Sequence, residues 1–418
     1  MAGEAVTGIW RDRDFVLFWS GQAVSLTGSS LTRVAMPLLA VLTLHAGPVG
    51  LGVLEAFVWL PFLGLPLLAG VYVDRHRKRP ILLTSNGLRA VLLGLVPVLA
   101  AANRLSLPVL CAIALVAGCC EVFFQVAELA FVPALVGRDR LLQANSSIEA
   151  ARSGAELAGP GIAGLIVQGF GAPVAMAVDA ASYLVSIASL GAIRRPEPPP
   201  EPVAAGRMWR DIADGMRFVW GSVPIRTAAM WGMLLNGAWQ AFNIPFVLYA
   251  ITDRHIGTGW WGLILALSGG AALLGALLAP RLAGRYGYGP AMIGTSAVLN
   301  LPMLLIPAAG GPLWTIRLAW LSAYAVSGLG AGVVNVLVIT LRAKITPDRL
   351  LGRVAASARL LVFAAIPLGA IAGGVLAGTL GNRTSLWLTT MVILATAFVM
   401  LPLRRLRVLP EPGGLAGT

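Results

Sequence analysis

The chain has 418 residues, of which 57% are hydrophobic and only 12% are charged. Soluble domains carry about a quarter charged residues, so this composition excludes a typical water-soluble enzyme and indicates an integral membrane protein. The formal net charge of +13 would suggest a nucleic-acid partner in a soluble chain. In a membrane protein the position of each positive charge along the chain must be considered first.

Apolar stretches recur along the whole sequence. A helix needs about 20 mainly apolar residues to cross a bilayer, and helices satisfy the backbone in lipid. The first stretch has no small-residue cleavage pattern and is predicted to be a retained span rather than a signal peptide. Twelve transmembrane helices are predicted, over residues 15–44, 48–72, 80–102, 107–133, 144–170, 172–193, 225–251, 259–280, 290–309, 313–341, 352–380 and 385–403.

The positive charges orient these spans. Of the 31 lysines and arginines, 23 fall on the side that holds the two termini and the even-numbered loops. Four lie on the opposite side (Arg104, Arg254, Arg317 and Arg383) and four lie deep within spans (Arg33, Arg89, Arg152 and Arg359). The bias predicts that both termini are cytoplasmic, and it accounts for most of the net charge without a nucleic-acid partner.

The chain divides into two groups of six spans. Residues 194–202 are proline-rich and cannot form a helix, so they are expected to be an extended linker. Residues 209–220 are predicted to form a short amphipathic helix along the membrane surface. We therefore expect a bundle over 1–193, a cytoplasmic linker over 194–224 and a bundle over 225–418.

The two halves also resemble each other at an offset near 209 residues. The triplet Asp139-Arg140-Leu141 matches Asp348-Arg349-Leu350, Gly164 and Gly169 match Gly373 and Gly378, and Pro37 lies close to the register of Pro245. Parallel repeats of this kind predict two bundles that face each other across a central path.

One loop carries a family signature. The segment Gly70-Val71-Tyr72-Val73-Asp74-Arg75-His76-Arg77-Lys78-Arg79 resembles the loop between spans two and three in the major facilitator superfamily. Further segments resemble the macrolide- and multidrug-efflux branch, which consists of drug:proton antiporters: residues 18–26, Leu351-Gly352-Arg353-Val354 and Pro367-Leu368-Gly369. The sequence departs from the signature at Arg77, where many members have glycine, and the second half keeps only Arg281, Gly284 and Arg285 of it.

The resemblance implies a cytoplasmic gate formed by Gly70, Asp74, Arg75, Lys78 and Arg79. By resemblance, Asp74 latches the start of span eleven near Gly352 in one conformation, and Arg75 pairs with an acid at the inner end of span four, where Glu128 is available. The alternative is that these charges only set topology, although topology alone does not require Asp74.

Span four places Glu121, Gln125 and Glu128 on one helical face by their i, i+4 and i+7 spacing. In span five, Glu149, Arg152 and Glu156 also share a face, so Arg152 is available to neutralise a span-four glutamate. Charges inside a bilayer need partners, protons or water. Either Glu121 is a protonatable coupling site, because desolvation disfavours its charged form, or the charges form a permanent ion-pair network.

A second charged set lies at a similar predicted depth near the outer surface. Arg33, Glu55 and Asp179 are expected to form a paired layer, in which one arginine between two acids satisfies most of the cost of burial. The unmatched acid would then titrate, and Glu55 is the better candidate for that role.

The second half carries mainly uncharged polar groups. Asn236, Gln240 and Asn243 share one face of span seven, and Trp239 lies beside them. We interpret these four residues as candidate contacts for an uncharged part of the substrate, with interhelical packing as the alternative. Span five (Gly159-Pro160-Gly161) and span eleven are glycine-rich. The resemblance implies that a glycine-rich span five is associated with export, and helix packing also explains the glycines of both spans.

These features predict a secondary active exporter of amphipathic small molecules by proton antiport in the bacterial cytoplasmic membrane. The partners expected are the substrate, protons and the lipid bilayer, with no nucleic acid, cofactor or metal, and the chain is expected to act as a monomer. A dedicated exporter or flippase for a metabolite, siderophore or lysophospholipid is the alternative. The sequence has no phosphate-binding lysine motif, and no hydrolase or metalloprotease motif supports an intramembrane enzyme.

Overall fold

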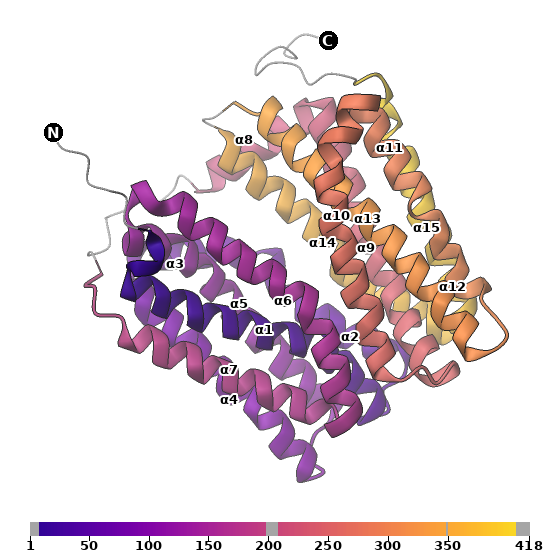
Figure 1. The fold of residues 1–418 in the computed structure, drawn as a ribbon, viewed down its shortest axis with the longest axis horizontal. Coiled ribbons are helices and arrows are strands. Elements are labelled where there is room, and N and C mark those ends of the chain that lie inside the picture. The colour runs from indigo at the N-terminus through magenta and orange to yellow at the C-terminus, as the bar shows by residue number, and fades with distance from the viewer. Residues whose placement is uncertain (1–7, 198–207, 348–349, 407–418) are drawn as a thin grey trace. The chain divides into compact units, whose positions relative to one another are not determined.

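The computed structural model describes residues 8–197, 208–347 and 350–406. All regular structure in these ranges is helical (Figure 1). The main elements are α1 (Arg13–Leu42), α2 (Pro48–Trp59), η2 (Leu60–Leu63), α3 (Leu65–Arg75), α4 (Lys78–Ala101), α5 (Leu107–Val136), η3 (Arg138–Arg140), α6 (Leu141–Phe170), α7 (Ala172–Ala192), α8 (Met208–Gly221), α9 (Val223–Leu248), a π-helical turn (Tyr249–Asp253), α10 (Thr258–Tyr286), α11 (Tyr288–Val298), η5 (Leu301–Leu304), α12 (Leu305–Ala308), α13 (Leu313–Ile345), α14 (Leu351–Leu380), α15 (Asn382–Val399) and η7 (Leu401–Arg405).

Many of these helices are suited to a membrane. In the described ranges, eight are long and apolar enough to cross one by length and composition, and a bent pair, Pro48–Leu63 with Leu65–Arg75, raises the number to nine. The predicted spans at 144–170, 225–251 and 385–403 are helical as α6, α9 and α15 but are not among these. The chain is therefore an all-helical protein with several apolar helices that suit a membrane.

Two of the predicted spans are interrupted. The second breaks at Leu60–Gly64, where Pro61 and Pro66 remove backbone donors that a continuous helix would use. The ninth breaks after Val298, and Pro302 lies in the short 3₁₀ turn that follows. Hydropathy reports an apolar stretch and does not distinguish an unbroken helix from one bent at proline.

The helices form two compact units by their mutual packing. The first unit contains residues 1–44 and 64–203, and the second contains residues 45–63 and 204–418. Residues 45–63, which include α2, thus group with the helices of the second half. The bundle boundaries expected from sequence remain a prediction about organisation in the membrane.

In the first unit, α1 packs along α7 and α6. Gly28 of α1 makes this approach possible, because a Cβ there would overlap the side chains of Ser182 and Asp179. At one end of the unit, a cluster of buried aromatic and aliphatic residues joins α1, α4, α5 and α6, with Phe15, Phe18 and Phe131 among them.

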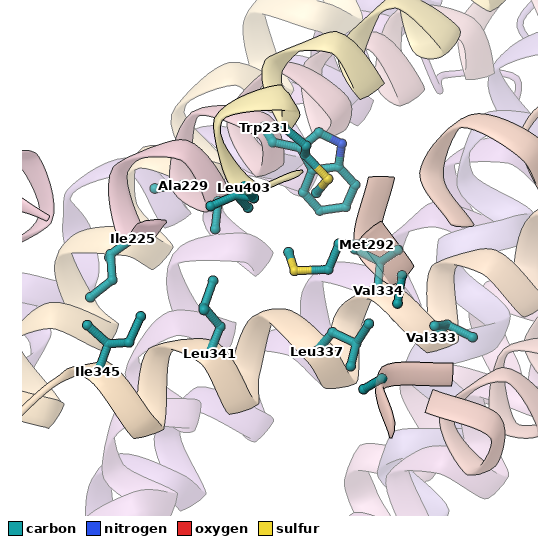
Figure 2. Packing of buried hydrophobic residues seen from close by; sticks show 14 of the residues in the cluster. Ile225, Ala229, Trp231, Met292, Val333, Val334, Leu337, Leu341, Ile345 and Leu403 are labelled. Carbon is teal, nitrogen blue, oxygen red and sulfur yellow. The ribbon is translucent and has the colours of Figure 1, made fainter. Parts of the chain in front are cut away.

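In the second unit, α13 supplies one continuous apolar face (Figure 2). Val333, Leu337 and Leu341 lie along it, and Trp231 of α9 and Met292 of α11 belong to the same buried cluster. Trp231 donates a hydrogen bond from Nε1 to Ser296 Oγ at 3.2 Å, so its polar atom is satisfied inside the core.

The amphipathic helix expected at 209–220 is confirmed as a helix, α8. It packs against α14, where a Cβ at Gly215 would overlap the Arg353 carbonyl, and Asp214 Oδ2 lies 3.5 Å from Arg353 Nη1. Its location along the membrane surface stays a prediction. Residues 198–202 of the proline-rich linker, and the Asp348-Arg349 pair of the internal repeat, lie outside the described residues.

The packing of α10 against α13 predicts a sharp difference between two glycines of α10. A Cβ at Gly275 would overlap the backbone oxygen of Leu329, whereas a Cβ at Gly284 meets nothing within 4 Å. Gly275→Ala should destabilise the protein by about 1–3 kcal/mol through overpacking. Gly284→Ala should be neutral or slightly stabilising, because alanine favours a helix. Thermal unfolding of both purified variants in detergent measures this difference, and equal melting temperatures would contradict the close approach.

Candidate functional site

A set of polar and charged side chains lies inside the first unit, between helices that are otherwise apolar. We call it the Arg89 cluster. It consists of Ser29 and Thr32 from α1, Arg89 from α4, Glu121 and Gln125 from α5, and Asp179, Ser182 and Tyr183 from α7.

Arg89 is the centre of this cluster and is only 6% exposed. Its Nη2 lies 2.5 Å from Glu121 Oε2 and donates to Ser29 Oγ at 3.2 Å. Its guanidinium carbon lies 4.1 Å from the centre of the Tyr183 ring, a cation–π contact. One buried cation thus contacts three neighbouring helices.

Both carboxylates of the cluster have further partners. Gln125 Nε2 donates to Glu121 Oε1 at 2.6 Å, so the shared face expected from their spacing brings them into contact. Asp179 is fully buried, and it accepts from Thr32 Oγ1 at 2.5 Å and from Ser182 Oγ at 3.1 Å. Arg89 also interacts electrostatically with Asp179.

The contacts of Arg33, Glu55 and Asp179 differ from the expected layer. Arg33 Nη1 lies 4.0 Å from Glu156 Oε1 on α6, and both side chains are more than half exposed. Asp179 is held by the hydroxyls of Thr32 and Ser182, while Glu55 accepts a hydrogen bond from Gln240 within the second unit. Depth along a span predicts height in the bilayer but not which neighbouring helix a side chain faces.

A second charged group lies farther along α5. Arg152 Nη2 of α6 lies 3.8 Å from Glu128 Oε2, and its Nε lies 3.6 Å from Glu149 Oε2, so the expected neutralisation of a span-four glutamate by Arg152 is present. Glu128 is buried, and its other oxygen has no hydrogen-bond partner among the described residues. Like the Arg89 cluster, this group has one arginine for two acids.

The signature loop lies at the end of α3 and the start of α4. Asp74 and Arg75 are exposed, and none of the ion pairs among the described residues includes Arg75, whose expected partner Glu128 is bound by Arg152. Gly70 lies on α3, where a Cβ would meet nothing within 4 Å.

Glu197, which sequence reasoning missed, caps the start of α4. Its carboxylate accepts from the backbone N–H groups of Lys78 and Arg79, the latter at 3.1 Å. A carboxylate at a helix N-terminus satisfies free donors and complements the helix dipole. The first residues after α7 are therefore attached to the signature loop.

Acids near the N-terminus also bind the residues that follow α7. Asp12 caps α1 and lies 3.3 Å from Arg140 Nη1 and 3.4 Å from Arg195 Nη2. Asp14 accepts from the backbone N–H groups of Arg194 and Arg195 at 3.3 and 3.0 Å. These contacts join the start of α1, η3 and the end of α7 at one end of the first unit.

In the second unit, the expected substrate contacts lie on α9 and are half-buried. Asn236 Nδ2 donates to Gly232 O in its own helix at 2.8 Å, and Gln240 Nε2 donates to Glu55 Oε2 at 3.0 Å. Trp239 packs edge-on against Phe242 and Tyr324, with ring centres 5.6 and 6.0 Å apart. Asn243 lies one turn beyond Trp239 on this helix.

The polar groups inside these helices are carboxylates, guanidinium groups, amides and hydroxyls. Within the described residues there is no group of three or more histidine, cysteine or acidic side chains that could hold a metal ion, and Cys111, Cys119 and Cys120 are free thiols. The buried charged groups are instead carboxylates paired with arginine, amide or hydroxyl groups.

Comparison with known sequences identifies the family. The sequence profile of the Major Facilitator Superfamily matches residues 18–365. The chain belongs to this superfamily. The resemblance seen in the signature loop is thereby confirmed, and the chain is a membrane transport protein rather than an enzyme.

Curated relatives include bacterial exporters. The chain is 30% identical over 396 residues to the multidrug efflux pump Tap of Mycolicibacterium fortuitum, covering 92% of this chain and 95% of that protein. It is 27% identical over 339 residues to the enterobactin exporter EntS of Escherichia coli O1:K1 / APEC, covering 79% of this chain and 77% of that protein.

Solved structures with the same fold are also transporters. The nucleoside transporter NupG aligns with a TM-score of 0.74 at 13% identity, covering 94% of this chain and 99% of that one. A bacterial homologue of the iron transporter ferroportin, in an inward-facing state, aligns with a TM-score of 0.74 at 16% identity, covering 96% and 100%. At these identities the likeness concerns the fold alone.

The group around Glu128 yields a test of charge pairing. Arg152→Gln leaves Glu128 without its cation, and we expect a loss of about 2 kcal/mol of stability. This is less than the roughly 3–5 kcal/mol for breaking a fully buried pair, because the Arg152 side chain is 32% exposed. The double variant Arg152→Gln with Glu128→Gln should recover most of that loss, as measured by thermal unfolding in detergent. If the double variant is as unstable as the single one, charge pairing is not what Arg152 contributes.

Proposed function

We propose that this protein is a secondary active exporter that moves amphipathic, drug-like small molecules out of a bacterial cell in exchange for protons. The observation that carries the proposal is the similarity to a multidrug efflux pump at 30% identity over nearly the full length of both chains. The proposed organisation is twelve spans in two six-helix bundles, with cytoplasmic termini, in the cytoplasmic membrane. The chain is proposed to act alone, without nucleic acid or cofactor.

The buried carboxylates of the first unit support proton coupling. Glu121, Glu128 and Asp179 lie within helices α5 and α7, where an ionised acid is costly unless it is paired. In both charged groups the acids outnumber the arginines, so binding of one proton removes the net negative charge. Glu55, Glu156, Arg33 and Arg152 are the further candidates for a coupling role.

The polar groups of α9 support a role in substrate contact. Gln240 and Trp239 are half-buried and combine a hydrogen-bonding amide with an aromatic face, which suits amphipathic compounds. Asn236 and Asn243 extend the same helix face. The bond from Gln240 to Glu55 gives this face an acid neighbour as well.

The signature loop supports a gate that depends on Asp74. The start of α14 follows Leu350, whose apolar side chain cannot accept hydrogen bonds from the first N–H groups of the helix. We propose that Asp74 supplies a carboxylate to this helix start near Gly352 in one conformation and leaves it in the other, with Gly70, Arg75, Lys78 and Arg79 shaping the loop. Exposure of Asp74 is consistent with that role.

A dedicated exporter is the second candidate. The similarity to an enterobactin exporter over 79% of this chain favours a siderophore or another single metabolite. The same helices and charges serve either function, so the breadth of the substrate range distinguishes the two. A lysophospholipid flippase belongs to this second class.

Expression in an efflux-deficient bacterium tests the leading proposal. We expect the protein to raise resistance to several chemically unrelated drugs and dyes, and a protonophore should abolish the protection because it dissipates the driving gradient. Protection that survives the protonophore would contradict proton coupling. If membrane expression is confirmed but no compound is exported, drug efflux is wrong and a dedicated substrate is favoured.

The gate is tested by Asp74→Asn, with Asp139→Asn as the matched control. Both acids are exposed, and Asp74 lies in the last turn of α3 while Asp139 lies in the short η3 turn between α5 and α6. A carboxylate at a helix N-terminus contributes up to about 2 kcal/mol, so losing it should slow export by up to roughly thirtyfold. Export of a fluorescent dye from cells with equal membrane expression measures the rates, and the Asp139 variant should match the wild type. If the Asp74 variant exports dye as fast as the wild type, Asp74 is not part of the gate.

A further inference from the structure

The charges of the Arg89 cluster do not balance. Arg89 is always positive, whereas Glu121 and Asp179 supply two negative charges when both are ionised. The other titratable groups that interact with Arg89, the Cys120 thiol and the Tyr183 hydroxyl, add no positive charge. With both acids ionised, the cluster would hold one uncompensated negative charge inside apolar helices.

Neighbouring cations in the described part of the chain do not supply the missing charge. Among the charged groups of α1 and α6, Arg33 pairs with Glu156, while Arg152 pairs with Glu128 and Glu149. Burial of an unpaired charge is far more costly than protonation of a carboxylate. A single bound proton makes the cluster neutral.

The two acids have different surroundings. Arg89 contacts Glu121 directly, and Gln125 donates to the second Glu121 oxygen. Asp179 is held mainly by the hydroxyls of Thr32 and Ser182, which donate to a carboxylate and can also accept from a carboxylic acid. The arrangement therefore suits an ionised Glu121 and a protonated Asp179.

We propose that the Arg89 cluster is a binding site for one proton, and that Arg89 is the positioning residue whose single charge is shared by Glu121 and Asp179. Its use in transport rests on the proposed antiport function. Glu121 is 25% exposed whereas Asp179 is fully buried, so Glu121 is the group that exchanges the proton with water.

Arg89 compensates the negative charge that moves from one acid to the other when the proton is transferred between them. When an O–H bond forms at Glu121 and the O–H bond of Asp179 breaks, the guanidinium charge is needed at Asp179 instead of Glu121. Arg89 interacts with both acids, so this exchange leaves the cluster neutral. Loss of the proton from Glu121 to water leaves the cluster with one net negative charge. A new proton must then bind to make the cluster neutral again.

Infrared difference spectroscopy on the purified full-length protein tests the proposal, because a protonated carboxylic acid has a carbonyl stretch that a carboxylate lacks. At neutral pH the cluster should contribute one such band. Glu121→Gln and Asp179→Asn should each remove it, because one acid then balances Arg89 without a proton. Arg89→Gln should raise the intensity of the cluster band about twofold, because neither acid keeps a cation and both are then protonated. Arg89→Lys should retain one band.

The matched control is Asp139→Asn, an exposed acid of η3 outside both charged groups, whose loss should leave the band unchanged. If Asp179 is protonated independently of Arg89, the band persists in Glu121→Gln, and the shared-charge proposal is overturned. A permanent ion pair with both acids ionised gives no cluster band in the wild type, which overturns it too. If Arg89→Gln does not fold, the two acid variants still decide.

This test needs neither substrate nor gradient, so it is independent of the export assay. A band pattern as expected, together with protonophore-resistant export, supports the site and refutes proton coupling. An unchanged band in both acid variants, together with protonophore-sensitive export, refutes the site and moves the coupling proton to another group, such as that around Glu128.

Discussion

Charged side chains inside apolar helices need partners, and in this protein a few arginines supply them. Arg89 lies between α1, α5 and α7, and Arg152 lies between two acids of α5 and α6. A lone charge at mid-bilayer costs about 3 kcal/mol on insertion scales, so the helices that carry these groups must pack in one register. The functional groups of the first unit are therefore also the groups that specify how its helices meet.

Small residues let the helices approach closely enough for such contacts. Gly28 of α1 leaves room for Asp179 and Ser182 of α7, which brings the Thr32 hydroxyl within hydrogen-bonding distance of Asp179. In the second unit, Gly369 and Gly373 of α14 lie against α9, and Gly374 lies against α2. The glycine-rich spans noticed in the sequence thus have a packing role, whatever their relation to export.

Much of the fold was predictable, because apolar stretches and the positions of proline, glycine and charge are visible in the sequence. Every predicted span is helical in the structure, and the amphipathic segment before α9 is a helix. The interruptions at Leu60–Gly64 and Asn300–Leu304 were missed, since mean hydropathy averages over a break. The family was recognisable from the loop that contains Asp74.

The site was predictable only in part. Spacing along one helix placed Gln125 and Glu121 on a shared face, where they form a hydrogen bond, since this placement depends on helix geometry alone. Arg89 was missed, and Arg33 was matched with the wrong neighbours, because contacts between helices depend on rotation about each axis. Glu197 was also missed, because it reaches the start of α4 from a segment more than a hundred residues away.

We propose that the proton bound in the first unit is exchanged for substrate during export. Proteoliposomes that contain the purified full-length protein and are loaded with an exported dye test this exchange through their internal pH. As dye leaves down its gradient, we expect protons to enter and the lumen to acidify with the wild type, whereas Glu121→Gln should release dye without acidification. Dye release by the wild type with no change in internal pH, or equal acidification by the variant, would rule out this exchange.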